Sequence, residues 1–287
     1  MSRLKRQNIL SGKKCWDYGR LSSTLKYFRQ LVRHGGITSL NISGSKLSDV
    51  STDTLKSVLR KMKLLRVENC RFSETQVNTI FQQISEGESE LESLYIGNNR
   101  LTGARPELLR GAVPRLRSLH CDNTNLCPGQ ITEMLLGIKE AEDLRLEEIN
   151  LMMNNMTPVN HLLLCQSLNR LKSVNIWGCE GILWTLLDRI NDGESNIQTL
   201  DIGLHDLCHY PEAIIAGAIT NCVSVRLDRC PLTLEQVSAI TEKITTKENL
   251  KLKHLQMSGD FTKRQIELIQ VTKNYLESVE FDSVFLM

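Results

Sequence analysis

The residues of this chain that could do chemistry do not form a catalytic signature. The sequence has no glycine-rich phosphate loop, nucleophile elbow, zinc-protease motif or Cys-x-x-Cys pair. His205, Cys208 and His209 are metal-ligand types at close spacing. His209, however, precedes Pro211 in a predicted loop, so the two imidazoles are not expected on one helix face. We therefore predict a chain that is not an enzyme, with no catalytic residue, no cofactor and no metal.

Recognition is the chemistry that other residues indicate. In three of the predicted strands an arginine is followed two residues later by an acid: Arg66/Glu68, Arg145/Glu147 and Arg226/Asp228. Trp177 occupies a position that we expect to face solvent, and Trp, Tyr and Arg are the commonest binding hot spots. The alternatives are intramolecular: pairing of the charges with one another, and packing of Trp177 on Glu147 and Gly203.

A short pattern that recurs ten times, every 24 to 30 residues, must position these side chains. It reads apolar-x-x-apolar-x-apolar and usually continues x-x-polar-x-apolar, most clearly between Leu91 and Leu101. The first apolar positions are Ile37, Met62, Leu91, Leu116, Ala141, Leu171, Ile197, Cys222, Leu252 and Leu276. Helical apolar spacing, as between Val77 and Ile84, follows many copies, so each period predicts one strand and one helix.

Polar residues inside the predicted strands limit how the helices can cover the sheet. His120, Arg145 and Arg226 each lie between two apolar strand residues. A parallel sheet covered on both faces has unbroken apolar strands, so one face here is expected to be solvated. We predict an α/β solenoid: a right-handed horseshoe of about ten repeats, with a parallel concave sheet and helices on its convex side.

The pattern resembles the leucine-rich repeat, in its long, helix-containing form of the ribonuclease-inhibitor type. The motif's asparagine is present as Asn99, and cysteine takes its place at Cys70, Cys179 and Cys230, as in the repeats of F-box proteins. Ser45, Thr124, Ile149, His205, Asp260 and Val284 fill the other copies. Ile149 and Val284 cannot form the turn-stabilising hydrogen bond, so the local geometry is expected to differ there.

The resemblance implies a non-enzymatic module that binds a protein through its concave face. It is similar to the repeat regions of nucleotide-binding innate-immune receptors and to those of F-box ubiquitin-ligase adaptors. A sensor of the first kind is the leading interpretation, and a ubiquitin-ligase substrate-recognition subunit is the alternative, although no F-box is seen. A third reading is a GTPase activator like that of the nuclear-transport GTPase Ran, which the non-acidic final residues argue against.

Two strand columns are expected to face the partner, because alternate strand residues point to the same side. From these columns we predict the partner-binding residues. They are Arg66, Tyr95, His120, Asp122, Arg145, Glu147, Trp177, Asp201, Arg226 and Asp228.

Charge and length divide the chain into a leader and a repeat domain. Residues 1–36 hold nine basic residues and one acid and include an amphipathic stretch, which predicts a basic leader with a capping helix. Residues 37–287 form the predicted repeat domain and carry more acids than bases, which argues against nucleic acid as the partner. The final predicted strand has no helix after it, so self-association through this C-terminal edge is a further expectation.

The cysteines indicate the compartment. Nine are present, and Cys70, Cys121, Cys179, Cys222 and Cys230 fall on core positions of the repeat rather than in terminal disulfide caps. The sequence also lacks a secretory signal and any apolar run long enough to cross a membrane. We expect reduced thiols, no membrane partner and an intracellular, cytoplasmic location.

Overall fold

A computed structural model describes residues 15–17, 38–157, 159–179 and 183–283. The chain divides into two compact units, residues 1–150 and 151–287, and each unit is described by itself. The amphipathic stretch expected to form a capping helix, and Val284, lie outside the described residues.

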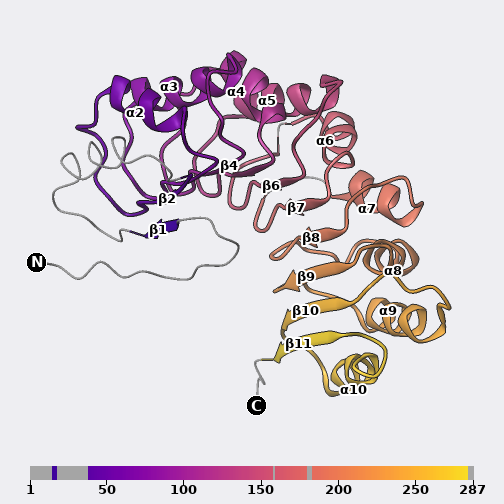
Figure 1. Cartoon of the computed structure of the whole chain (residues 1–287). Coiled ribbons are helices and arrows are strands. Elements are labelled where there is room, and N and C mark those ends of the chain that lie inside the picture. Colours follow the sequence, from indigo (N-terminus) through magenta and orange to yellow (C-terminus); the bar gives the residue numbers. More distant parts are fainter. Residues whose placement is uncertain (1–14, 18–37, 158, 180–182, 284–287) are drawn as a thin grey trace, which may run out of the picture. The chain divides into compact units, whose positions relative to one another are not determined.

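The first unit alternates parallel strands with helices in chain order. Its strands are β1 (Cys15–Asp17), β2 (Ser39–Asn41), β3 (Leu64–Arg66), β4 (Ser93–Tyr95), β5 (Ser118–His120) and β6 (Glu148–Asn150), each paired with the next. Its helices are α2 (Thr52–Leu59), α3 (Glu74–Ser85), α4 (Pro106–Ala112) with the short 3-10 turn η1 (Val113–Arg115), and α5 (Pro128–Glu140). The α-helices lie together on one side of β2–β6 (Figure 1).

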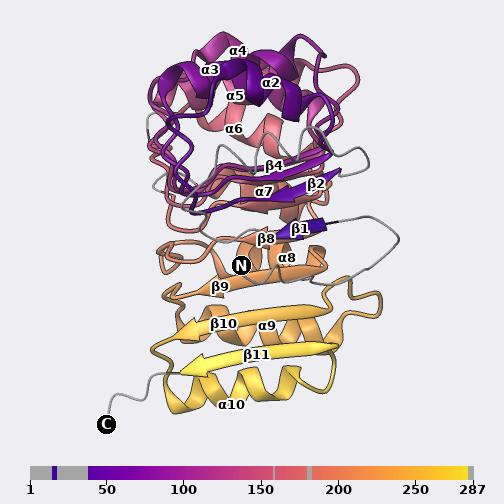
Figure 2. The same ribbon diagram turned by 60° about the vertical axis from the view of Figure 1, so that its left-hand side comes forward.

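The second unit repeats this arrangement. Its strands are β7 (Ser173–Asn175), β8 (Thr199–Asp201), β9 (Ser224–Asp228), β10 (His254–Gly259) and β11 (Ser278–Ser283), again parallel neighbours in chain order. Its helices are α6 (His161–Leu168), α7 (Trp184–Asn191), α8 (Glu212–Asn221), α9 (Leu234–Thr246) and α10 (Lys263–Thr272). Figure 2 shows α8, α9 and α10 behind β9–β11, with the strands in front of them.

Burial alternates along the strands as the polar interruptions predicted. In β9, Val225 and Leu227 are buried against the helices, whereas Arg226 between them is exposed. We call the sheet face opposite the helices the open face of each unit. The repeated strand–helix arrangement of the predicted α/β solenoid is therefore confirmed.

The turn after each strand is held by the motif's polar position. Asn99 is buried, and its amide donates to the carbonyls of Val67 and Ile96 while its oxygen accepts from the Cys70 backbone. The cysteines do the same work with fewer bonds: Sγ of Cys70, Cys179 and Cys230 donates to the carbonyl of Ile42, Leu151 and Ile202, respectively. His205 takes the equivalent place, with Nε2 3.0 Å from the Ile176 oxygen. The predicted burial of the motif cysteines is confirmed.

A second ladder joins helices to turns. Gln76, Gln130, Gln236 and Gln265 are buried at the third position of their helices. The side-chain oxygen of each accepts from the N-cap backbone N–H, which closes a capping box. The amide of each then donates to a turn of the preceding repeat; Gln130, for example, reaches the carbonyls of Leu101 and Ala104. The ladder therefore fixes one repeat to the next.

The predicted register of the fifth repeat is wrong. Sequence analysis placed a strand at Leu144–Leu146, but β6 is Glu148–Asn150, and Asn150 pairs with His120 where Arg145 was expected. Both registers satisfy the apolar spacing of the motif, because Leu146 is the last apolar residue of the expected strand and the first apolar residue of the observed motif. The observed motif runs from Leu146 to Met156 and places Asn154, not Ile149, at the polar turn position. Asn154 is buried and donates to the Leu151 carbonyl, so this turn is held in the same way as the others.

The structure adds a strand that sequence analysis did not find. β1, at Cys15–Asp17, pairs with β2 and lies within the segment assigned to the basic leader. The boundary between a leader at 1–36 and a repeat domain at 37–287 remains a prediction.

Candidate functional site

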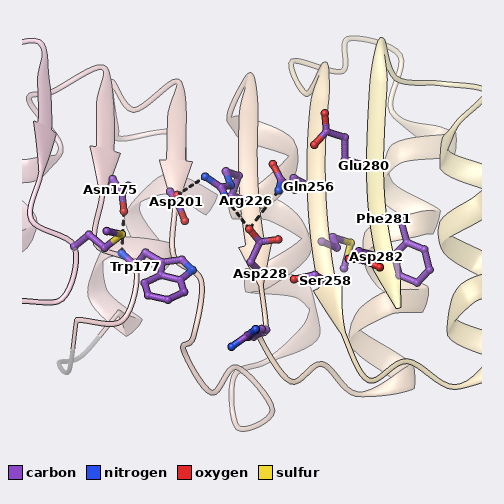
Figure 3. Close-up of a pocket in the computed structure, with 13 residues that line it drawn as sticks. Asn175, Trp177, Asp201, Arg226, Asp228, Gln256, Ser258, Glu280, Phe281 and Asp282 are labelled. Carbon is purple, nitrogen blue, oxygen red and sulfur yellow. Dashed lines mark hydrogen bonds and ion pairs between the residues drawn. The ribbon is translucent and has the colours of Figure 1, made fainter. Parts of the chain in front are cut away.

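The open face of the second unit holds a pocket of about 710 Å³. It is lined by Met152, Asn175, Trp177, Asp201, Arg226, Asp228, Arg229, Gln256, Met257, Ser258, Glu280, Phe281 and Asp282. The side chains labelled in Figure 3 come from β7 to β11 or, for Trp177, from the turn just after β7. Because the strands are parallel and in register, the open-face columns of the repeat lie beside one another here.

Arg226 is the centre of the polar network in this pocket. Its guanidinium lies 2.6 Å from Oδ2 of Asp228 and 3.4 Å from Oδ2 of Asp201 (Figure 3). Gln256 donates to the same Asp228 oxygen at 3.3 Å. Arg226 is therefore paired with acids of its own chain, which is one of the two roles that the sequence left open for it. The pairing holds the guanidinium over the middle of the pocket, with about half of its side chain exposed.

Two carboxylates, the buried Asp201 and the partly buried Asp228, give the pocket its electrostatic character. Burial raises the pKa of Asp201, although Arg226 opposes the shift, and the Gly203 backbone N–H donates to its Oδ1. Oδ1 of Asp228 is buried and has no hydrogen-bond partner among the described residues. A buried acceptor without a donor costs free energy, so this carboxylate is not fully stabilised within the described part of the chain.

Trp177 borders the pocket and packs within the sheet. Its backbone N–H donates to Oδ1 of Asn175, and its indole lies against Gly203, where a Cβ atom would overlap Cδ1 and Nε1 of the ring. The expected packing of Trp177 on Gly203 is thus present. Glu147, the other residue on which Trp177 was expected to pack, lies in the first unit, in the loop before β6. The ring keeps one side on the pocket, so packing and recognition are compatible.

The open face of the first unit holds a stack of three side chains from neighbouring strands. Cζ of Arg66 lies 3.8 Å from the centre of the Tyr95 ring, a cation–π contact. On its other side Tyr95 stacks on His120, with ring centres 4.1 Å apart and planes 17° apart. The predicted residues Arg66, Tyr95 and His120 are therefore brought together.

His120 also connects the stack to an acid. Its Nε2 lies 3.1 Å from Oγ of Ser118 and 3.3 Å from Oε1 of Glu148. The hydrogen bond from His120 holds the pKa of Glu148 below its usual value, with a smaller contribution from Arg66. The stack therefore offers the cationic Arg66 and the aromatic Tyr95, while its His120 end lies against the carboxylate of Glu148.

Asp122 lies beside the stack and has its own partners. Its carboxylate accepts from the Asn98 amide at 3.2 Å and occupies the space over Gly97. The lack of a side chain at 97 therefore allows the carboxylate to lie flat across the sheet, as Gly203 does for Trp177.

Eight of the ten predicted site residues form two groups, and the other two do not lie on the open face. Arg66, Tyr95, His120 and Asp122 lie together in the first unit, and Trp177, Asp201, Arg226 and Asp228 lie together in the second. Arg145 and Glu147 are wrongly placed, because both lie in the loop before β6 and Glu147 pairs with the exposed Arg117. Whether either group binds a partner remains a prediction.

Several pocket residues were not predicted. Met152 was missed because of the register error in the fifth repeat, since it takes the column position assigned to Glu147. Asn175, Gln256, Glu280 and Asp282 were in the two columns, and their convergence needed the pairing of β7 to β11. Phe281 holds an apolar position of the last repeat, which predicts a place in the core, but it is only half-buried and lines the pocket.

The structure gives no support to metal binding at the histidines singled out from the sequence. His205 is turned toward the Ile176 carbonyl, and burial lowers its pKa. His209 is exposed and lies 3.8 Å from Asp206. Among the described residues, no three His, Cys, Asp or Glu side chains are grouped as metal ligands. Within the same residues, none of the helices has the length and apolar character of a membrane span.

Comparison with known proteins supports the fold. No family model and no curated protein sequence matches this chain. Among solved structures, it is similar to the leucine-rich repeat-containing protein LegL7 from Legionella pneumophila, with a TM-score of 0.58 and 14% identity over 93% of this chain and 90% of that one. A chain of the Rad7 and Elc1 complex in yeast aligns with a TM-score of 0.37 and 11% identity, over 91% and 82%. The repeat motif, the alternating strands and helices and the likeness to LegL7 show that this chain has the leucine-rich repeat fold.

Proposed function

We propose that this protein is a non-enzymatic recognition module that binds a protein partner through the open face of its repeats. The observation that carries the proposal is the pocket of the second unit, where Trp177 and Arg226 lie among mainly polar side chains of the open face. Aromatic and arginine side chains beside one another are the usual centre of a protein interface. The leucine-rich repeat fold is commonly used in this way, but fold alone does not establish function.

The placement of the cysteines supports an intracellular setting for this binding. None of the cysteines whose side chains are described forms a disulfide, and most are buried in the repeats. Disulfides are rare where thiols are kept reduced, as in the cytosol. We infer that the partner is met inside the cell.

Affinity capture with point variants tests the proposal. The tagged protein is used to capture partners from its own cells, beside Trp177→Ala, Arg226→Ala and Glu242→Ala. Glu242 is exposed on helix α9 and serves as the matched control. We expect at least one partner that the two open-face variants lose and the control retains, since hot-spot truncations cost about 2 kcal/mol or more. Equal retention by all three variants would reject binding through this face.

Self-association through the edge of β11 is a second prediction. Among the described residues, β11 pairs only with β10, and Val279 and Phe281 are less buried than the equivalent Leu255 and Met257. An unpaired strand edge can pair with another chain. Sedimentation at increasing protein concentration tests it: a single monomeric species throughout would argue against this edge as a contact.

A further inference from the structure

One backbone position recurs along the repeats and has a positive φ in nine of them. It is the residue just before the motif's polar position. The residues there are Gly44, Asn69, Asn98, Asn123, Met153, Gly178, Leu204, Arg229 and Gly259, all with positive φ. Glycine and asparagine tolerate this conformation, whereas most other residues rarely adopt it. The three exceptions, Met153, Leu204 and Arg229, are all in the second unit.

The two apolar exceptions are exposed and adjacent. Met153 is 48% exposed and Leu204 is 42% exposed, with φ values of 59° and 62°. Gly178 lies between them in the intervening repeat: a Cβ atom placed on it would lie 2.7 Å from Sδ of Met153 and 3.6 Å from Cδ1 of Leu204. We call these three residues the apolar shelf. Both side chains lie over Gly178, which has no side chain to cover them, so a large part of each stays exposed.

The shelf adjoins the pocket. The Met153 backbone N–H donates to the Trp177 carbonyl, and the Leu204 N–H donates to the Asp228 carbonyl. Met152, which precedes Met153, lines the pocket, as do Trp177 and Asp228. An apolar surface and a polar pocket therefore meet at one rim of the sheet.

The charge of the pocket indicates what would complement it. Asp201, Asp228, Glu280 and Asp282 line it against Arg226 and Arg229, so acids outnumber bases. Arg226 is already paired with Asp201 and Asp228. Glu280 and Asp282 are exposed and form no close ion pair within the described part of the chain, although Glu280 is near enough to Arg226 to help raise the pKa of that arginine. Opposite charge across an interface favours binding and selects the partner.

We propose that the second unit binds a protein segment that places a lysine or arginine in the pocket, beside Asp228 and Glu280, and an apolar side chain on the shelf. The proposal rests on the proposed function and names the chemistry of its partner. The basic side chain pairs with the exposed Glu280 and lies next to the carboxylate of Asp228, whose buried Oδ1 has no hydrogen-bond partner among the described residues. The apolar side chain covers Met153 and Leu204, which removes their exposed surface from water.

A displayed library of random dodecapeptides, selected on the full chain, tests this. The affinity of each enriched peptide is then measured for the wild type and for two double variants, Glu280→Gln/Asp282→Asn and Met153→Asn/Leu204→Asn. Glu242→Gln and Leu162→Asn are the matched controls, since both side chains are exposed on helices. We expect enriched peptides to pair a basic with an apolar residue and to lose about tenfold or more in affinity for both double variants, but not for the controls.

The shelf variant carries its own check on folding. Asparagine suits the left-handed position better than Met or Leu, so the melting temperature of Met153→Asn/Leu204→Asn should equal or exceed that of the wild type. Lost binding with retained stability would support recognition by the shelf. A lower melting temperature would show that the two side chains stabilise the fold instead, and this would overturn their assignment.

The remaining outcomes decide between the inference and the function on which it rests. Enriched peptides without a basic residue, peptides that both double variants still bind, or no enrichment at all would overturn the inference. If a cellular partner is nevertheless lost by Trp177→Ala and kept by both double variants, binding through the open face stands and only its assigned chemistry fails. If Trp177→Ala also keeps that partner, both fail.

Discussion

The indole of Trp177 lies over Gly203 in the neighbouring repeat, in the space that a side chain at 203 would occupy. Gly203 lies in the same open-face column as Trp177, and its backbone N–H donates to Asp201. The glycine therefore sets where the ring rests and hence which side of it borders the pocket.

Replacing Gly203 with alanine should displace the indole. The new methyl group would overlap Cδ1 and Nε1 of the ring, so Trp177 must turn toward solvent. We expect a red shift in Trp177 fluorescence, measured as the difference between otherwise identical chains with Trp or Phe at 177. The same methyl group would also approach the Asp228 carbonyl oxygen at 2.9 Å, so a double-mutant cycle is needed. In this cycle, Gly203→Ala is introduced into the wild type and into the Trp177→Ala variant. If it also weakens partner binding by the Trp177→Ala variant, the loss of binding caused by Gly203→Ala does not act through the indole ring.

His205 should make stability depend on pH. Burial lowers its pKa below 6.5, so the unfolded chain takes up a proton more readily than the folded chain. The contribution of the neutral His205 side chain to the free energy of unfolding is fully present above about pH 6.5 and is lost as the pH falls below that value. Denaturant unfolding from pH 8 to pH 5 measures the slope, and His205→Cys should reduce it.

Cysteine is the appropriate replacement because Cys179 and Cys230 donate to the equivalent carbonyls in adjacent repeats. The variant should therefore keep its stability at pH 8. An unchanged pH slope in a folded His205→Cys protein would show that other groups cause the dependence.

Gln130→Leu should be strongly destabilising. Gln130 is buried, donates to the Leu101 and Ala104 carbonyls and accepts from the Cys127 backbone N–H. Leucine would leave these buried groups without partners, at a cost of about 1–3 kcal/mol for each group that stays unsolvated. Urea unfolding of this variant beside Gln270→Leu, an exposed position, measures the difference. Similar midpoints for the two variants would contradict a structural role for the ladder.

The thiols should react at widely different rates. Burial raises the pKa of Cys70 and Cys179 to about 11 and that of Cys222 and Cys230 to about 12, so few thiolates form there. Cys127 is exposed and Cys208 is partly exposed. A thiol reagent should therefore show a fast phase that Cys127→Ser/Cys208→Ser removes, apart from any contribution of Cys15. About nine thiols are expected after denaturation without reductant; fewer would indicate disulfides and contradict an intracellular location.

The corrected register predicts that Asn154 stabilises the first turn of the second unit. Asn154→Ala removes a buried hydrogen bond to the Leu151 carbonyl and should lower the free energy of unfolding by about 1–3 kcal/mol. Asn155→Ala, one residue later and exposed, should change it much less. The opposite order in thermal unfolding would favour the register originally predicted from the sequence.

Much of the fold could be predicted from the sequence, because the repeat period, the strand alternation and the motif cysteines all follow from apolar spacing. The fifth repeat failed for a physical reason: Ala141, Leu144 and Leu146 satisfy the apolar pattern as well as the true strand does. Only the polar turn position distinguished the two registers, since Ile149 cannot hold a turn and Asn154 can. The glutamine ladder also has a sequence pattern that could have predicted it: a Ser, Thr or Cys is followed three residues later by Gln.

The candidate site was less predictable, because it depends on where side chains turn. The columns correctly grouped Arg66 with Tyr95 and Asp201 with Arg226. Spacing could not show that Arg66 would stack on a ring while Arg226 would pair with acids. It also could not show that Met153 and Leu204 would be held outward, since their left-handed backbone is visible only in three dimensions.

The glutamine ladder has a mechanical consequence. Each of the four glutamines ties its helix to the preceding repeat, and strand pairing and turn hydrogen bonds likewise join only neighbouring repeats, so a force applied at one end of a unit acts first on the outermost repeat. Stretched between its ends, the chain should give way in steps rather than at once. A repeat of roughly 25 residues would lengthen it by on the order of 80–90 Å per step when fully extended. Such a protein would yield under tension by losing repeats singly, while those still folded keep their surfaces intact.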